Sequence, residues 1–251
     1  MIPTSHELAE LKKAHEPSAI SERLAAARSK HNYVGDMVLG GIDGCVTTFA
    51  IMASAMGAGF SNTVIITLGL ANLAADGFSM AVSNYQATQS HVDKLESTRK
   101  SEELHIDILP EGEREEVRQI FSQKGFEGEV LERIVETITS NKKLWIETML
   151  QEEHGLTLYP LSPLKSGFST FTAFVLIGIL PLIPFFLFNG DQQDIFTFSC
   201  IIASCAFFGI GLSKGWVLGI APWKPALSTL LSGAAAASLA FGMGYWLETI
   251  L

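Results

Sequence analysis

The chain has 251 residues, of which 48% are apolar and 17% are charged, and its mean hydropathy is +0.30. This composition is too apolar for an ordinary soluble domain and indicates a protein of the lipid bilayer. The formal net charge of −9, without a basic patch interleaved with aromatic residues, argues against a nucleic-acid partner.

Residues 1–33 are polar and carry no short apolar core followed by a small-residue cleavage site, so we expect no signal peptide. From residue 18 to residue 33, apolar and basic side chains alternate at helical spacing, with Ile20 and Leu24 set against Arg23 and Arg28. This pattern is typical of a helix that lies on a membrane surface. We therefore predict an amphipathic N-terminal segment.

Five apolar stretches follow, each with the length of about 20 residues that a membrane-spanning helix needs. They cover residues 34–58, 63–85, 167–188, 195–218 and 226–247. Between the second and the third lies a charged segment, residues 89–165, which we call the insert. We therefore predict an all-α membrane protein with four parts: residues 1–33, spans one and two (34–88), the insert, and spans three to five (166–251).

The basic residues indicate the orientation of these spans. Of the 17 lysines and arginines, five precede the first span, ten lie in the insert, and two flank the connection between spans four and five. All of them then fall on one side of the membrane, which the positive-inside rule identifies as the cytoplasm. We expect a multi-pass protein whose N-terminus and insert are cytoplasmic, in a bacterial inner membrane or, in a eukaryote, a vacuolar membrane.

Span one carries polar residues on one helical face, because Asp36, Asp43 and Thr47 recur at helical spacing with Gly40. A charge at the centre of a span costs about 3 kcal/mol, so Asp43 is a candidate for a transport pathway. Asp36 lies near the interface, where solvation accounts for it equally well. Gly40 and Gly44 form a GxxxG pair, which permits close approach of another helix.

Span two has a similar stripe of side chains, formed by Asn72, Asp76, Met80 and Ser83. Carboxylate, amide and thioether groups together suit a borderline divalent cation, although a lone methionine in a span is more often a packing residue. Two desolvated acids on one pathway favour the binding of a proton or a cation. The pair Asp43 and Asp76 therefore supports proton-coupled metal transport.

The insert reads as helical, with predicted segments over residues 84–109, 111–124 and 129–153, the last broken near residues 139–143. Metal-binding side chains share helical faces at spacings of three or four: Glu102 with His105, Glu113 with Glu116, and Met149 with Glu152 or Glu153. A solvated helix surface is the ordinary explanation for such acids. The excess of acids over bases in the insert instead favours a cation site on the cytoplasmic side.

Four stretches of the chain resemble conserved blocks of the vacuolar iron transporter family: GGIDGCVTTFAI, GLANLAADGFSMAVSNY, EREEVRQIFSQKGF and TSNKKLWIETMLQEEHGL. The resemblance implies a five-span homodimer whose first two spans line a pathway at the dimer interface. It also implies a cytoplasmic three-helix domain that binds divalent metal. The implied activity is export of Fe²⁺, or in some members Mn²⁺, from the cytoplasm, usually in exchange for protons and without a prosthetic group.

The same resemblance implies roles for individual residues. Asp43 corresponds to the pathway acid and Met80 to the pathway thioether. The cytoplasmic ligands would be Glu102, Glu113, Glu116, Met149 and Glu153, with Glu152 nearby. This chain departs from the family pattern at His105, where a further Glu is expected, and at Leu150, where a second Met is common. His105 is a good ligand for Fe²⁺ or Zn²⁺.

Two other functions compete with transport. The Glu102-x-x-His105 motif also occurs in ferritin-like di-iron oxidases, but such sites need two of these motifs and two further Glu residues on a four-helix bundle, and this sequence has one motif. A metal sensor without transport would need no acids inside the membrane. We therefore expect a transporter and not an enzyme.

Overall fold

The computed structural model describes residues 5–29 and 32–250. All regular structure in these residues is helical, and five helices are long and apolar enough to cross a membrane, as the sequence predicts. The chain divides into two compact units, Met1–Asn32 with Ser90–Leu161, and Tyr33–Gln89 with Ser162–Leu251. We call the second of these the membrane unit.

The N-terminal residues form two helices in contact with each other, α1 (Ser5–Ala14) and α2 (Pro17–Ser29). Helix α2 begins with a proline, which suits a first helical turn because that position needs no N–H donor. Lys30 and His31, near the end of the predicted amphipathic segment, lie outside the described residues.

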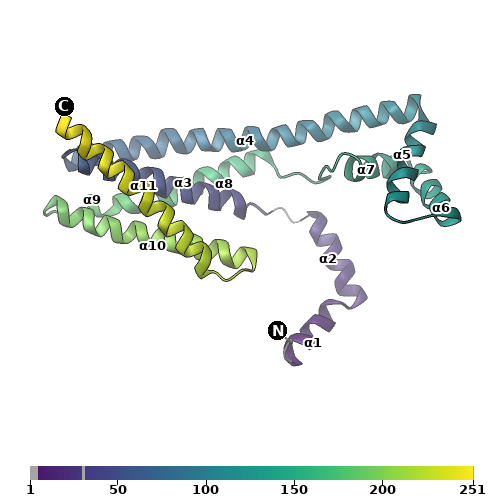
Figure 1. Cartoon of the computed structure of the whole chain (residues 1–251), viewed down its shortest axis with the longest axis horizontal. Coiled ribbons are helices and arrows are strands. Elements are labelled where there is room, and N and C mark those ends of the chain that lie inside the picture. Colours follow the sequence, from purple (N-terminus) through teal and green to yellow (C-terminus); the bar gives the residue numbers. More distant parts are fainter. Residues whose placement is uncertain (1–4, 30–31, 251) are drawn as a thin grey trace. The chain divides into compact units, whose positions relative to one another are not determined.

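The membrane unit contains α3 (Val34–Gly57), the first part of α4 (Asn62–Ile108), α8 (Pro163–Gly178), α10 (Gln192–Leu218) and α11 (Trp223–Ile250). Helix α3 contacts α8, α10 and α11 (Figure 1). The predicted third span is interrupted: α8 passes through the short helices η1 (Leu180–Leu182) and α9 (Ile183–Leu187). Pro181 and Pro184 lie at this interruption, where each removes a backbone N–H from the helical ladder.

Helix α3 packs against α8 with its backbone close to that of its neighbour. A Cβ atom added at Gly40 would collide with the carbonyl oxygen of Thr170, and one added at Gly44 would collide with that of Phe174. The expected close approach at this GxxxG pair is therefore confirmed, with α8 as the partner. Helix α4 is tied to the same neighbour, because the Asn84 side-chain amide donates to the Thr170 hydroxyl at 2.7 Å.

The insert is built from the end of α4, α5 (Pro110–Gln123), α6 (Gly128–Thr139) and α7 (Lys142–Glu152). Its apolar core includes the buried side chains of Val117, Val135, Trp145 and Leu150. The break predicted near residues 139–143 falls between α6 and α7, where the Asn141 side chain accepts a hydrogen bond from a backbone N–H at 3.2 Å. This cap satisfies one of the free donors at the start of α7.

Candidate metal site and intramembrane polar residues

One cavity of about 360 Å³ lies within the insert, and we call it the acidic cavity. The end of α4, the start of α5 and the residues that follow α7 all contribute to it. Its lining residues are Ser97, Thr98, Ser101, Glu102, His105, Glu113, Glu116, Glu153 and His154. Four carboxylates and two imidazoles thus come together from three segments that are separate in the sequence.

The hydrophobic pattern of the helices carries two of these acids into the interior. Glu102 lies one helical turn before the buried Ile106, and Glu113 lies one turn before the buried Val117. Residues four apart share a helical face, so packing of Ile106 and Val117 into the core draws the two carboxylates inward with them. Glu102 is 2% exposed and Glu113 is 6% exposed.

Each of these buried acids has an oxygen that lacks a partner. The Oε2 atoms of Glu102 and Glu113 are buried and accept no hydrogen bond. A buried polar atom without a partner costs about 1–3 kcal/mol, and more when it is charged. An ionised carboxylate can only accept hydrogen bonds, so a cation in the cavity would satisfy both atoms.

The electrostatics of the acidic cavity also favour a positive charge. Burial, followed by the charges of Glu102 and Glu116, raises the pKa of Glu113 to about 7, while His105 acts in the opposite direction. Burial likewise raises the pKa of Glu153, although His154 opposes this shift. Crowded, desolvated carboxylates hold protons when no cation is present. A cation that bound in the cavity near neutral pH would therefore displace a proton from Glu113.

The imidazoles face the carboxylates. His105 Nδ1 lies 3.4 Å from Glu113 Oε1, and His154 Nε2 lies 2.9 Å from Glu102 Oε1 and 3.6 Å from Glu153 Oε2. Two sets of three side chains place their ligand atoms within 4.8 Å of one another: Glu102, His105 and Glu113, and Glu102, Glu153 and His154. Glu102 belongs to both sets.

Two of the ligands predicted from the sequence lie away from this cavity lining. Met149 is fully buried in the apolar core of the insert, and Glu152 forms an ion pair with Lys124. His154 was not predicted, although the acidic pair that precedes it in the sequence could have drawn attention to it. Helix α7 ends at Glu152, so helical spacing beyond that residue says little about which side chains meet.

The polar residues of the first two spans also come together in space. The carboxyl groups of Asp43 on α3 and Asp76 on α4 lie close enough to repel each other, and both residues are partly buried. The Asn72 amide is within 3.3 Å of the Thr47 hydroxyl, and the latter donates to the Asp43 carbonyl at 2.8 Å. The two stripes predicted on spans one and two therefore face each other.

The remaining predicted pathway residues have mixed surroundings. Met80 is partly buried and packs against an apolar cluster that includes Leu73 and Phe174. Asp36 is partly buried, with one carboxylate oxygen that accepts no hydrogen bond. Within the described part of one chain, no set of three acidic, histidine or cysteine ligands surrounds Asp43 or Asp76.

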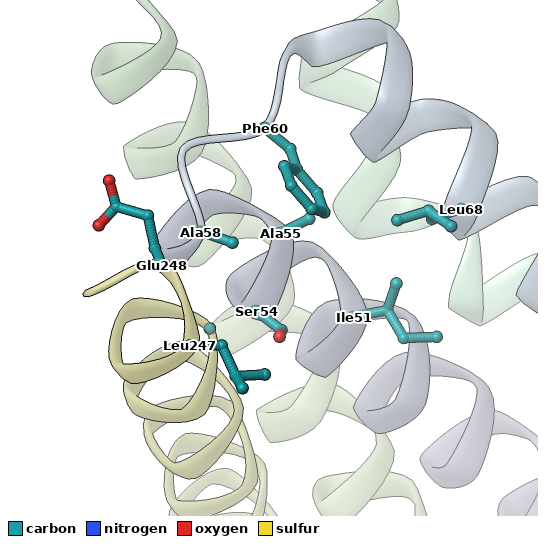
Figure 2. A pocket seen from close by; sticks show the side chains of 9 residues that line it. Ile51, Ser54, Ala55, Ala58, Phe60, Leu68, Leu247 and Glu248 are labelled. Carbon is teal, nitrogen blue, oxygen red and sulfur yellow. The ribbon is translucent and has the colours of Figure 1, made fainter. Parts of the chain in front are cut away.

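A second cavity, of about 480 Å³, lies among α3, α11 and the start of α4. Figure 2 shows its apolar lining, with Ile51, Leu68 and Leu247 around it and Glu248 at its edge. One acidic side chain beside an apolar lining does not make a ligand set for a cation.

Comparison with known proteins agrees with these features. Residues 34–245 match the model of the VIT family. A vacuolar iron transporter from Toxoplasma gondii is 33% identical over 230 residues, which cover 88% of this chain and 76% of the relative. Vacuolar iron transporter 1 from Arabidopsis thaliana is 34% identical over 209 residues, which cover 83% of each chain. A vacuolar iron transporter from Centaurea cyanus is 32% identical over 230 residues, which cover 89% of this chain and 94% of the relative. The chain is therefore a member of the VIT family, an integral membrane protein with several spans.

Proposed function

We propose that this protein transports Fe²⁺ out of the cytoplasm, with Mn²⁺ as a second substrate, and that protons move in the opposite direction. The observation that carries the proposal is the contact between the polar stripes of two membrane-spanning helices, where the Asn72 amide lies within 3.3 Å of the Thr47 hydroxyl. Each stripe contains one partly buried acid, Asp43 on α3 and Asp76 on α4. The names of the relatives, vacuolar iron transporters, support iron as the metal.

Two acids inside a membrane need a positive partner. A single charge at the centre of a span costs about 3 kcal/mol, and two adjacent negative charges add repulsion to this cost. The described contacts of Asp43 and Asp76 include no lysine or arginine, and the neighbouring polar groups are the neutral Asn72 and Thr47. A divalent cation or protons would supply the missing charge, which is the exchange that an antiporter needs.

The acidic cavity would capture the metal before transport. Ten of the 17 basic residues lie in the insert, which supports its cytoplasmic location. Its buried, unpartnered carboxylate oxygens would bind a metal ion from the cytoplasm and raise the metal concentration near the membrane. Fe²⁺, Mn²⁺ or Zn²⁺ would occupy this site as cargo.

We also propose that the transporter is a homodimer. One subunit offers Asp43, Asp76 and the Met80 thioether from two helices, fewer protein groups than a transition metal usually binds. The apolar residues Phe78 and Val82 on the same part of α4 are exposed in the single chain. A second copy against this helix would cover them and would bring a second set of polar side chains to the pathway.

Purified protein in sealed liposomes tests the proposal. An Fe²⁺-quenched dye inside the liposomes reports metal entry under anaerobic conditions, and a second dye reports lumenal pH. We expect Asp43→Asn to lower the initial rate of Fe²⁺ entry at least about tenfold, since it removes charge that the ion must meet inside the membrane. Asp194→Asn, at an exposed acid in the first turn of α10, is the matched control and should transport normally. Equal rates in the wild type and Asp43→Asn would contradict the proposed role.

Proton exchange is tested in the same liposomes. With a higher proton concentration inside, Fe²⁺ entry should accelerate and the lumen should become more alkaline as metal enters. An Fe²⁺ flux that neither moves protons nor responds to the pH gradient would show that the metal crosses without proton exchange.

A further inference from the structure

Helical spacing does not explain the position of His154. The residue follows the end of α7, and its side chain is 31% exposed. Even so, its Nε2 atom is directed at two carboxylates, Glu102 Oε1 at 2.9 Å and Glu153 Oε2 at 3.6 Å. One ring nitrogen between two carboxylate oxygens marks a point where a cation could bind to all three atoms.

The acidic cavity contains two overlapping groups of possible ligands. Glu102 groups with His105 and Glu113 in one set, and with Glu153 and His154 in the other. Each set has one imidazole, and Glu102 is common to both. A carboxylate has two oxygens, and a shared carboxylate therefore can bind one metal ion with each.

A second and independent observation points to ligands at both places. Glu102 and Glu113 are more than nine-tenths buried, line the cavity, and each keeps a buried Oε2 atom that accepts no hydrogen bond. The imidazoles engage only the Oε1 atom of each acid. The Oε2 atoms therefore remain available to a bound ion, whereas coordination by His154 Nε2 would replace its hydrogen bond to Glu102 Oε1.

We infer that His154 is a metal ligand which, with Glu102 and Glu153, forms a second ion position beside that of His105 and Glu113. The inference rests on the proposed function in that it takes the acidic cavity as the place where the transported metal binds. It adds an imidazole that the family resemblance did not implicate, and with it a basis for selectivity.

The charge balance of the cavity agrees with two ions and two neutral imidazoles. Four carboxylates line it, Glu102, Glu113, Glu116 and Glu153, and two divalent cations neutralise them. Further acids would leave the filled cavity negative, which is unfavourable for buried groups. Neutral imidazoles complete the coordination without added charge.

Imidazole ligands also decide which ions the cavity accepts. Imidazole suits Fe²⁺, Co²⁺ and Zn²⁺, whereas sites made only of oxygen ligands suit Mg²⁺, Ca²⁺ and Mn²⁺. With one imidazole at each position, the cavity should favour Fe²⁺, Co²⁺ and Zn²⁺ over Mg²⁺ and Ca²⁺. His154 would thereby determine selectivity at the second position.

The test is a calorimetric titration of the full-length protein in detergent with Zn²⁺, repeated in the presence of Mg²⁺ as a competitor. We expect the wild type to bind two ions in the acidic cavity. His154→Gln should weaken one of them at least about tenfold, since changes even to outer-shell partners cost about 10- to 100-fold. The control is His91→Gln, which removes an exposed histidine of α4 that does not line the cavity and should leave both affinities unchanged.

A second variant separates coordination from a merely structural role. His154→Asp replaces the imidazole with an oxygen ligand, so the second ion should still bind but Mg²⁺ should now compete with it. Zinc X-ray absorption of protein loaded with two equivalents should show on average one imidazole per zinc in the wild type. The same spectrum should show half that number in His154→Asp.

The possible outcomes separate this inference from the proposed function. If His154→Gln and His154→Asp keep the wild-type zinc affinity, Mg²⁺ competition and imidazole count, His154 is not a ligand, whatever the liposomes show. If these values change as expected but the wild type moves no Fe²⁺ into liposomes, His154 is a ligand and the proposed transport function is contradicted. If the variants lose all zinc binding, unlike His91→Gln, the two positions are not separate and the two-ion arrangement is refuted.

Discussion

The buried carboxyl group of Glu113 should make the metal-free insert less stable as the pH rises. Its pKa is raised from 4.5 to about 7 in the folded protein, chiefly by burial and then by the charges of Glu102 and Glu116. A raised acid pKa means that the folded state holds a proton that the unfolded state releases. Stability from this group is therefore complete below about pH 4.5, is lost between about pH 4.5 and 7, and stays lost above that range.

The size of the effect follows from the shift. Each pKa unit corresponds to about 1.4 kcal/mol, so the shift of Glu113 costs the folded insert about 3 kcal/mol at pH 8 compared with pH 4. Glu113→Gln keeps the shape of the side chain but cannot ionise. The difference in stability between Glu113→Gln and the wild type should therefore grow by about 3 kcal/mol in favour of the variant over this pH range.

Hydrogen exchange of the backbone amides in α5 and α6 measures this stability locally. The protein is kept metal-free by a chelator throughout the measurement. After correction for the intrinsic pH dependence of exchange, protection in the wild type should fall from pH 4 to pH 8 more steeply than in Glu113→Gln. Glu129→Gln, at an exposed acid in the first turn of α6, is the matched control and should follow the wild type. Equal slopes for the wild type and Glu113→Gln would refute the reasoning.

The remaining predictions concern packing and metal binding. Gly44→Val should destabilise the membrane unit by several kcal/mol, because the new side chain would collide with the backbone of Phe174. Gly35→Ala, at a glycine with open space around it, is the control and should leave the melting temperature in detergent unchanged. A normal melting curve for Gly44→Val would contradict the described contact. Zn²⁺ at 100 times its Kd should stabilise the insert by about 2.7 kcal/mol for each ion bound, measurable as slower hydrogen exchange and reversed by chelation. If exchange is not slowed, Zn²⁺ does not bind the folded insert. Lys124→Ala removes an ion pair to Glu152 at the surface and should change stability by no more than about 1 kcal/mol. It should leave zinc affinity unchanged, so a tighter affinity, from the freed carboxylate, would place Glu152 nearer the metal than the structure does.

Local properties of the sequence were sufficient to predict the membrane spans and the close helix contact at Gly40 and Gly44. A run of apolar residues long enough to cross a bilayer can be recognised without knowing what packs beside it. A GxxxG pair likewise predicts that another helix approaches closely. The sequence did not say which helix would fill that space. The answer, α8 at Thr170 and Phe174, depends on how all the spans pack together.

The acidic cavity shows the limit of the same reasoning. Helical spacing correctly grouped Glu102 with His105 and Glu113 with Glu116, because both pairs lie within single helices and line one cavity. It could not show that His154 faces Glu102, since Glu102 lies on α4 and His154 lies beyond the end of α7. It also could not show that Met149 packs into the apolar core, which is a property of the folded insert.

The sequence by itself determined the membrane class, the five apolar helices, the charged insert and the acids that have no ordinary place in a span. These are matters of composition and of periodicity along one helix, where hydrophobic burial and the cost of desolvating a charge act residue by residue. Only the tertiary structure decided that the polar stripes of the first two spans meet at Asn72 and Thr47 and that Glu102 and Glu113 are buried with unpartnered oxygens. It also decided that His154 lies beside Glu102 and Glu153. Such contacts join residues that are distant in the chain, and they arise only when the core packing of several helices fixes where each side chain lies.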